Sequence, residues 1–297
     1  MKYGWMIYSK SAIHNRYGNN AFAWMTETAA KHHIHLDILF VEDLMIQIAS
    51  SVTFYHKNEQ LKLPDFVLMR CYNRIVGSQL EQLGIRVINP ISAMFQSRNK
   101  VITSQLLTHA GIPTPKTVYT VTNDYSLISN HFSKKPFILK EVEGSQGKNV
   151  FLIKNEHDFT EAFNTTKGYC LCQEYMDNSY GKDLRVYVLG GRVIGSVLRK
   201  SKSGFRANYS LGGTAEFYET SKAIELLSVQ AAKALNLEFC GIDLLFTNNG
   251  FTVCEVNGNA GFRTISKVSD VDIAEELFIY VDQVVYGHEP VIGSSDC

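Results

Sequence analysis

The stretch CGIDLLFTNNGFTVCEVNGNAG, residues 240–261, places two acidic residues, Asp243 and Glu255, each within a run of apolar residues. If residues 248–250 form a three-residue hairpin loop with the glycine in the left-handed conformation, Asp243 pairs with Glu255. Asn257 then shares a face with Glu255, because residues two apart in a strand point the same way. A turn made of only the last two loop residues would shift the pairing by one position, and both registers remain open.

In the first register, the carboxylates of Asp243 and Glu255 oppose each other across the strand pair. At about 4 Å and an effective dielectric constant of about 20, their repulsion is on the order of 4 kcal/mol. A cation removes this repulsion, and two carboxylates with the amide of Asn257 suit Mg²⁺, which binds oxygen ligands and nucleotide phosphates. The alternative is that both acids face solvent and pair with arginines.

A second candidate site is the glycine-rich turn in FILKEVEGSQGKNVFLI, residues 137–153. A P-loop is excluded because Asn149 replaces the Ser or Thr that binds magnesium, and because a strand, not a helix, follows. We interpret the turn as a lid whose backbone N–H groups and Ser145 hydroxyl close over phosphate oxygens, with Lys140 as a fixed positive charge. The alternative is an ordinary solvated hairpin loop.

The elements that must position these residues differ between two parts of the chain. Residues 3–8, 35–41 and 63–70 have the composition of buried strands and alternate with helical patterns at 19–33 and 76–83. This order predicts a parallel sheet covered by helices, in a module that ends near the proline at the end of RVINP.

From residue 93 onward, short strands dominate, interrupted by a helix that carries Lys100 and further helices near 156–164, 220–236 and 272–285. This pattern predicts antiparallel sheets with helices, and so a mixed α/β and α+β fold. The expected domains are residues 1–92, 93–174, 175–288 and a tail at 289–297.

Bulk composition narrows the class of protein. The 297 residues carry 29 basic and 29 acidic side chains, so no net field recruits nucleic acid or an anionic membrane. Six cysteines lack Cys-x-x-Cys spacing, which favours reduced thiols in a cytoplasmic protein. Because no run of about 18 apolar residues occurs, we expect no membrane span.

Together these motifs resemble the ATP-grasp superfamily, and within it the branch of ribosomal protein S6 modification enzymes (RimK-like) and LysW-type amino-acid ligases. In order, over roughly residues 90–265, they are LKEVEGSQGKNV, QEYMDNSYGKDLRVYVLGGRVIG, GFRANYSLGG, GIDLLF and EVNGNAGF. The resemblance implies an ATP-grasp fold, with an N-terminal parallel α/β domain and two β-rich subdomains clamping ATP.

The resemblance also implies a reaction: a carboxylate takes the γ-phosphate of ATP, and an amine attacks the acyl phosphate to form an amide. ATP and Mg²⁺ are the implied cofactors, with Mn²⁺ as a substitute. The implied partners are an amino acid and a carboxylate-bearing peptide, protein or amino acid, and a homo-oligomer is expected. A phosphotransferase and a nucleotide-binding regulator without turnover are the alternatives.

Around the nucleotide, the resemblance implies individual roles. Lys100 and Lys140 match the two lysines that contact the α and β phosphates, and Asp183 matches a residue near the ribose. The implied lid consists of Gly144, Ser145, Gln146 and Gly147, and the implied adenine-reading segment of Gln173, Glu174, Tyr175 and Met176.

At the reacting end, Arg206 and Asn208 fall where the family places groups that face the transferring phosphate and the acyl phosphate. Arg185 has a position that faces phosphate or substrate. Asp243, Glu255 and Asn257, which we call the carboxylate hairpin, match the family's magnesium ligands. The chain departs from the family at Ala260 and Glu141, where proline is common, so the sequence leaves acceptor specificity open.

Overall fold

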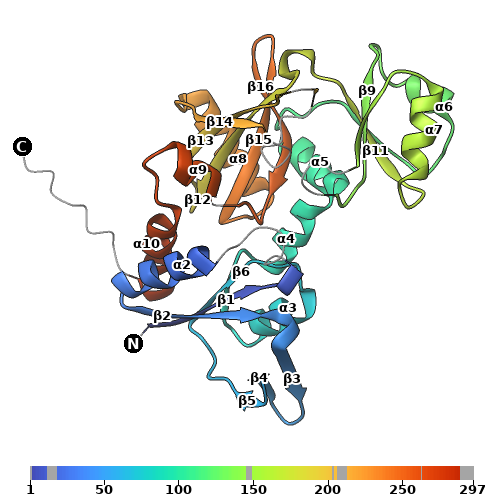
Figure 1. Ribbon diagram of the computed structural model, residues 1–297. Coiled ribbons are helices and arrows are strands. Elements are labelled where there is room, and N and C mark those ends of the chain that lie inside the picture. The colour runs from blue at the N-terminus through green and yellow to red at the C-terminus, as the bar shows by residue number, and fades with distance from the viewer. Residues whose placement is uncertain are drawn as a thin grey trace, which may run out of the picture. The chain divides into compact units, whose positions relative to one another are not determined.

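The computed structural model describes residues 2–11, 19–144, 149–202, 204–205, 213–261 and 263–287 (Figure 1). The chain divides into two compact units, one of residues 1–91 with 272–297 and one of residues 92–271. Within the described ranges, no helix combines the length and apolarity that crossing a bilayer requires. The first unit is therefore made of two separate segments of the chain, whereas the second unit is one continuous segment.

The first unit is built on a parallel sheet with strand order β2-β1-β6-β7, as the alternating pattern predicted. Its strands are near-continuous apolar runs, the composition of parallel strands covered on both faces. Helix α2 packs on β2, and α3 packs on β7. The elements are β1 (Lys2–Tyr8), α2 (Asn19–Lys31), β2 (Ile34–Phe40), β6 (Phe66–Met69), α3 (Arg74–Gln82) and β7 (Arg86–Ile88).

The last helix, α10 (Ile273–Tyr286), packs against α2 and belongs to the first unit. The prediction that residues 175–288 form one subdomain is therefore wrong for this helix. Its apolar face, which includes the fully buried Phe278, is covered by an element about 250 residues earlier in the chain. The spacing of apolar residues within α10 does not indicate which distant element covers them.

A small antiparallel sheet between β2 and β6 was not predicted. It has the strand order β3-β4-β5 and follows a short 3₁₀ turn at Val41–Asp43. Phe54 of β4 is buried, and its ring meets that of Trp5 edge-on at a centroid separation of 5.7 Å. The strands are β3 (Leu44–Ile48), β4 (Val52–His56) and β5 (Glu59–Gln60).

The expected single helix around Lys100 is two helices, α4 (Ile91–Arg98) and α5 (Lys100–His109). Asn99 separates them with extended backbone, and its side chain accepts hydrogen bonds from the N–H groups of the second and third residues of α5, each at 3.1 Å. This is an N-cap, which satisfies donors left without partners at a helix start. Lys100 is consequently the first residue of α5.

Replacing Asn99 with alanine removes this cap. We expect the free energy of unfolding to fall by about 1 kcal/mol, the usual cost of losing an N-cap side chain. Urea denaturation followed by circular dichroism measures the change. Asn99→Asp, which keeps a capping oxygen, is the matched control and should unfold like the wild type; equal loss in both variants would show that the cap is not the cause.

The second unit begins with a four-stranded antiparallel sheet of order β10-β9-β11-β8. Helices α6 and α7 pack together beside it (Figure 1). Tyr125 of α6 and Phe159 of α7 each place a ring against the buried ring of Phe137. Lys140 is the last residue of β9. The elements are β8 (Thr117–Thr120), α6 (Tyr125–Ser129), β9 (Phe137–Lys140), β10 (Val150–Ile153), α7 (Glu156–Asn164) and β11 (Cys170–Glu174).

The same unit contains a five-stranded antiparallel sheet of order β14-β13-β12-β15-β16. Helix α8 packs across four of its strands, and α9 packs on β13 and β14. The elements are β12 (Lys182–Leu189), β13 (Arg192–Lys200), β14 (Thr214–Phe217), α8 (Lys222–Ala234), β15 (Phe239–Thr247), β16 (Gly250–Asn257) and α9 (Arg263–Val268), with a 3₁₀ turn at Asp177–Ser179.

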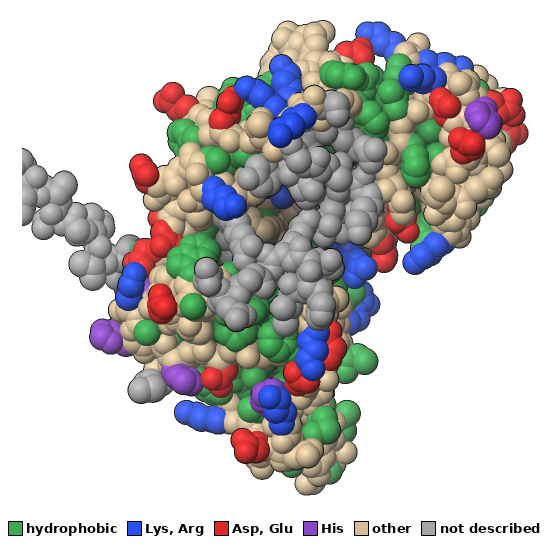
Figure 2. Space-filling model, viewed as in Figure 1, with side chains coloured by type: hydrophobic (Ala, Val, Ile, Leu, Met, Phe, Trp, Pro, Cys, Tyr) green, Lys and Arg blue, Asp and Glu red, His purple; other side chains and the backbone are tan. Residues whose placement is uncertain are grey.

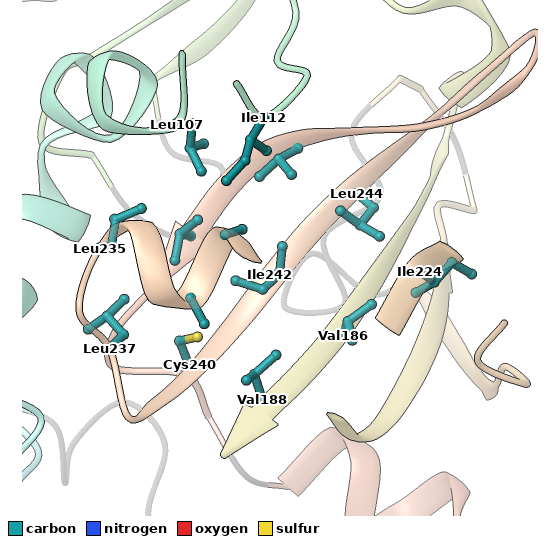
Figure 3. Close-up of a cluster of buried hydrophobic side chains, with 14 of the residues drawn as sticks. Leu107, Ile112, Val186, Val188, Ile224, Leu235, Leu237, Cys240, Ile242 and Leu244 are labelled. Atoms are coloured by element: carbon teal, nitrogen blue, oxygen red, sulfur yellow. The ribbon is translucent and has the colours of Figure 1, made fainter. Parts of the chain in front are cut away.

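Alternate residues of β12 and β15 form the core of this sheet. Val186, Val188, Ile242 and Leu244 are fully buried and cluster on the side of the sheet that α8 covers (Figure 3). Because side chains alternate between faces, the intervening residues of the same strands project from the opposite face. That face carries the charged residues of the candidate site. The division of residues 92–271 into two subdomains remains a prediction, and the tail at 289–297 lies outside the described residues.

Candidate active site

The hairpin of β15 and β16 pairs Asp243 with Glu255, as predicted. The loop differs from the prediction, since residues 248–249 alone connect the strands and Gly250, at φ +141°, begins β16. This shorter loop pairs Leu244 with Val253. Cys254 then forms a bulge in β16, so the register shifts by one residue and Asp243 pairs with Glu255. The predicted pairing is therefore right and the predicted loop is wrong.

Asp243 is buried and bound by two arginines. Arg185, its direct neighbour on β12, donates from Nε to Oδ1 and from Nη2 to Oδ2, both at 2.6 Å. Arg199 on β13 places Nη2 3.1 Å from the same Oδ2, and it also donates to both carboxylate oxygens of Asp183 at 2.6 and 2.7 Å. The acid pairs with arginines, as the alternative interpretation had it, but it does so inside the protein and not at a solvent-facing strand.

These contacts determine the charge of the site. Burial opposes ionisation of Asp243, yet Arg185 and Arg199 lower its pKa to about 2. Burial also opposes the charge of Arg199, but Asp243 and Asp183 raise its pKa above the ordinary value. Asp243 is therefore an anion at neutral pH, which is the form that a metal ion binds.

Glu255 and Asn257 extend from β16 on the same face. The Asn257 Nδ2 group lies 3.3 Å from Asp243 Oδ2 and 3.4 Å from the Gly241 carbonyl, so its amide oxygen is the acceptor that remains. Within the described part of the chain, no three His, Cys, Asp or Glu side chains gather as a metal cluster. Two carboxylates and an amide oxygen nevertheless form a hard oxygen donor set that fits Mg²⁺ with retained water.

The two predicted lysines meet at this hairpin. Lys140 donates to Gln173 Oε1 at 2.6 Å and lies 3.4 Å from the Cys254 sulfur. Lys100 lies 3.8 Å from Glu255, donates from Nζ to the Gly144 carbonyl, and has its pKa lowered by burial. The start of α5 and the end of β9 thus bring both ammonium groups to the carboxylate hairpin.

The predicted adenine-reading segment follows directly. Gln173 is buried and also donates to Thr117, while Glu174 is exposed and its backbone N–H donates to the Lys116 carbonyl at 2.8 Å. Tyr175 and Met176 come next and are half-buried. Among the described residues, Gln173 is the member of this segment that hydrogen-bonds a predicted phosphate-binding lysine, Lys140.

Asp183 has a different environment from the one its implied role suggests. Both of its carboxylate oxygens accept hydrogen bonds from Arg199, and the residue is only 8% exposed. A position beside the ribose stays a prediction for Asp183.

Several predicted residues fall beyond the described ranges. Ser145, Gln146 and Gly147 of the lid and the catalytic candidates Arg206 and Asn208 lie outside the described residues. The context of the lid is described, however: β9 and β10 are antiparallel neighbours, with Lys140 opposite Val150. The glycine-rich segment therefore joins two strands, as predicted, and the chain does not enter the helix that a P-loop requires.

Two residues of the site were missed from the sequence, Arg199 and Cys254. The β12–β13 hairpin turns at Gly190–Gly191, and an unbroken register from that turn would place Leu198 opposite Asp183. An irregularity between Tyr187 and Val188 shifts the pairing so that Arg199 takes this place. The signal in the sequence is Arg199 itself, a basic residue near the end of the strand-like segment RVIGSVLRK. In the sheet, this strand lies two positions from the strand of Asp243.

The model of the RimK-like ATP-grasp domain matches residues 97–281, which include every described residue of the site. The chain belongs to the RimK-like ATP-grasp family. A probable alpha-L-glutamate ligase of Maridesulfovibrio salexigens is 33% identical over 239 residues, covering 77% of this chain and 79% of the relative. Human N-acetylaspartylglutamate synthase A is 34% identical over 258 residues, covering 80% of this chain and 66% of the relative.

Solved structures agree with this assignment at the level of fold. The ATP-grasp ligase PsnB, in complex with its minimal precursor, Mg and ADP, superposes with a TM-score of 0.68 at 19% identity, covering 93% of this chain and 95% of that one. The predicted ATP-grasp fold is confirmed. This RimK-like ATP-grasp protein is an ATP-dependent carboxylate–amine ligase, and ligases of its family use ATP and Mg²⁺.

Proposed function

We propose that this enzyme joins the amino group of glutamate to the carboxylate of a peptide, a protein tail or an amino-acid derivative. The observation that carries the proposal is the face of the five-stranded sheet opposite α8, where Asp243, Glu255 and Asn257 meet Lys100 and Lys140. The choice of glutamate is supported by the names of two relatives, a glutamate ligase and an N-acetylaspartylglutamate synthase, each of which refers to glutamate.

The proposed reaction has two steps. A carboxylate oxygen of the acceptor attacks the γ-phosphorus of ATP, which forms an acyl phosphate and releases ADP. The amine of glutamate then attacks the acyl carbon, the C–O bond to phosphate breaks, and the amine loses its proton. Phosphoryl transfer develops negative charge on the phosphate oxygens, so fixed cations are the main requirement of the site.

The chain's own residues supply this environment. Lys140 would contact the α and β phosphates, and its hydrogen bond to Gln173 fixes the ammonium group in place. Lys100 would do the same from the start of α5, where its contacts with Gly144 and Glu255 join the base of the lid to the hairpin. Groups held in this way need little reorganisation during the reaction, which is how electrostatic preorganisation lowers a barrier.

The metal ligands in this proposal are Asp243, Glu255 and Asn257. When bound, Mg²⁺ supplies charge neutralisation at the phosphates of the nucleotide. Arg185 holds Asp243 as an anion and orients it by a bidentate pair of hydrogen bonds. No nucleophilic side chain is needed, because the acceptor carboxylate itself attacks the phosphorus.

Surface and thiol chemistry are in keeping with a cytoplasmic enzyme that binds its substrates at a local site. Figure 2 shows basic and acidic side chains interspersed over the visible face, matching the net charge of zero. The five described cysteines are free thiols, which supports a reducing compartment. A homo-oligomer and the use of Mn²⁺ in place of Mg²⁺ remain predictions.

Product analysis tests the proposed function. The enzyme is incubated with MgATP, glutamate and a panel of acceptors comprising glutamate-ended peptides, polyglutamate and N-acylated amino acids, and both ADP and product masses are measured. We expect ADP release with a mass gain equal to glutamate less water. A gain of one phosphoryl group would support the phosphotransferase alternative, and lysine in place of glutamate tests whether the amine substrate must be acidic.

A further inference from the structure

A four-residue charge network on the face opposite α8 links three neighbouring strands. Arg199 is 6% exposed and lies on β13, while Asp243 lies on β15, with β12 between them. Adjacent strands are about 4.8 Å apart, so the Arg199 side chain reaches across a whole strand to contact Asp243. On the way, it is held by both carboxylate oxygens of Asp183 on β12.

The contacts on the two oxygens of Asp243 are unequal. Oδ2 is approached by Arg185 Nη2 at 2.6 Å, Arg199 Nη2 at 3.1 Å and Asn257 Nδ2 at 3.3 Å. Among the described residues, Oδ1 is contacted by Arg185 Nε alone, at 2.6 Å. Since each carboxylate oxygen can accept about two hydrogen bonds, Oδ2 is saturated and Oδ1 keeps capacity for a further ligand.

We propose that Arg199 is a positioning residue, which is anchored by Asp183 and orients Asp243 so that its Oδ1 oxygen is presented to the metal ion. This inference rests on the metal site of the proposed function and assigns Asp183 the role of an anchor. Arg199 touches neither substrate nor metal in this role and acts through Asp243. The guanidinium group suits the task because its planar fork can bind one carboxylate with two donors while a donor also reaches a second carboxylate.

The network pairs the two buried acids Asp183 and Asp243 with Arg185 and Arg199. Burial raises the pKa of Asp183, and its contact with Arg199 opposes that rise. Removing the charge of Arg199 leaves Asp183 without this partner, and an uncompensated buried charge is strongly destabilising. We therefore expect Arg199→Met to destabilise the fold. Arg199→Lys, which keeps the charge and loses the fork, is the informative variant.

The test measures metal binding without turnover. Mn²⁺ affinity is determined by electron paramagnetic resonance in the presence of a non-hydrolysable ATP analogue, for the wild type, Arg199→Lys, Asp183→Asn and the double variant. We expect both single variants to weaken Mn²⁺ binding by about 10- to 100-fold, the usual effect of removing a residue that orients a metal ligand. Affinity for the analogue without metal should change by less than about threefold, far below that loss.

Lys200→Met is the matched control. Lys200 follows Arg199 on the same strand, but its side chain is half-exposed and pairs with Glu216 on the surface. This variant should bind Mn²⁺ like the wild type. If Arg199 acts through its Asp183 anchor, the double variant should bind Mn²⁺ no more weakly than either single variant. The two substitutions would then remove the same interaction, so their effects would not add.

Three outcomes among the variants would overturn the inference and leave the metal site standing: wild-type Mn²⁺ affinity in folded Arg199→Lys, fully additive losses in the double variant, or an equal loss in Lys200→Met. Folding is checked for each variant by circular dichroism. The measurement does not depend on which amine or acceptor the enzyme uses, so a failed glutamate assay leaves this result standing. Absence of Mn²⁺ binding in the wild type would instead remove the metal site and this inference together.

Discussion

Glu255→Gln is expected to lower the rate of ADP formation by at least about 100-fold. Losing a residue that merely orients a metal ligand costs about 10- to 100-fold, so losing a charged ligand should reach the upper end or exceed it. Glutamine keeps the size of the side chain and removes its charge, and Glu255 is partly exposed in a hairpin whose pairing does not depend on that charge. A coupled assay of ADP release at increasing Mg²⁺ concentrations measures the effect.

Glu216→Gln provides the control for this prediction. Glu216 lies on β14 of the same sheet, but its side chain is exposed and contacts Lys200. We expect this variant to keep wild-type activity. Near-normal activity in Glu255→Gln at low Mg²⁺ would remove Glu255 from the metal site.

Lys140→Met is expected to lower kcat/KM for ATP by about 10²- to 10³-fold, the range seen when one preorganised charge-stabilising group is removed. Methionine retains most of the length of the side chain and loses the ammonium group that Gln173 holds at 2.6 Å. Initial rates at varied ATP concentration separate the effect on binding from the effect on the chemical step.

Lys154→Met controls for the loss of one positive charge near this sheet. Lys154 directly follows β10 and is exposed, whereas Lys140 ends the neighbouring strand β9. The control should behave like the wild type. If both variants lose activity equally, the loss would reflect the net charge and not the position of Lys140.

Short-range patterns were sufficient to predict two features of the geometry of the candidate site. Asp243 and Glu255 were placed opposite each other, and Lys140 was placed at the end of a strand, because alternation and turn residues determine which side chains share a face. The same reasoning chose the wrong loop for the hairpin. Its pairing was right because the bulge at Cys254 restored the expected register, and no sequence rule indicates a bulge there.

Contacts between distant segments could not be predicted. Arg199 reaches Asp243 only because a second irregularity shifts β13 along β12. The contact therefore depends on how two strands pair, which the sequence of either strand alone does not determine. The break at Asn99 was missed because the apolar pattern continues through it, although asparagine is a common N-cap. The packing of α10 on α2 depends on the whole chain, and the periodicity of α10 alone is equally compatible with the second unit.

The discontinuity of the first unit bears on how the chain folds during synthesis. The parallel sheet emerges from the ribosome before the second unit, but Phe278 and the rest of α10, which cover α2, are translated only after the whole second unit. Domains generally fold as units from the N-terminus, so the continuous second unit can finish folding while the first still exposes apolar surface. Nascent chains arrested before residue 272 should therefore bind chaperones through their N-terminal portion, and release should follow once α10 has been translated.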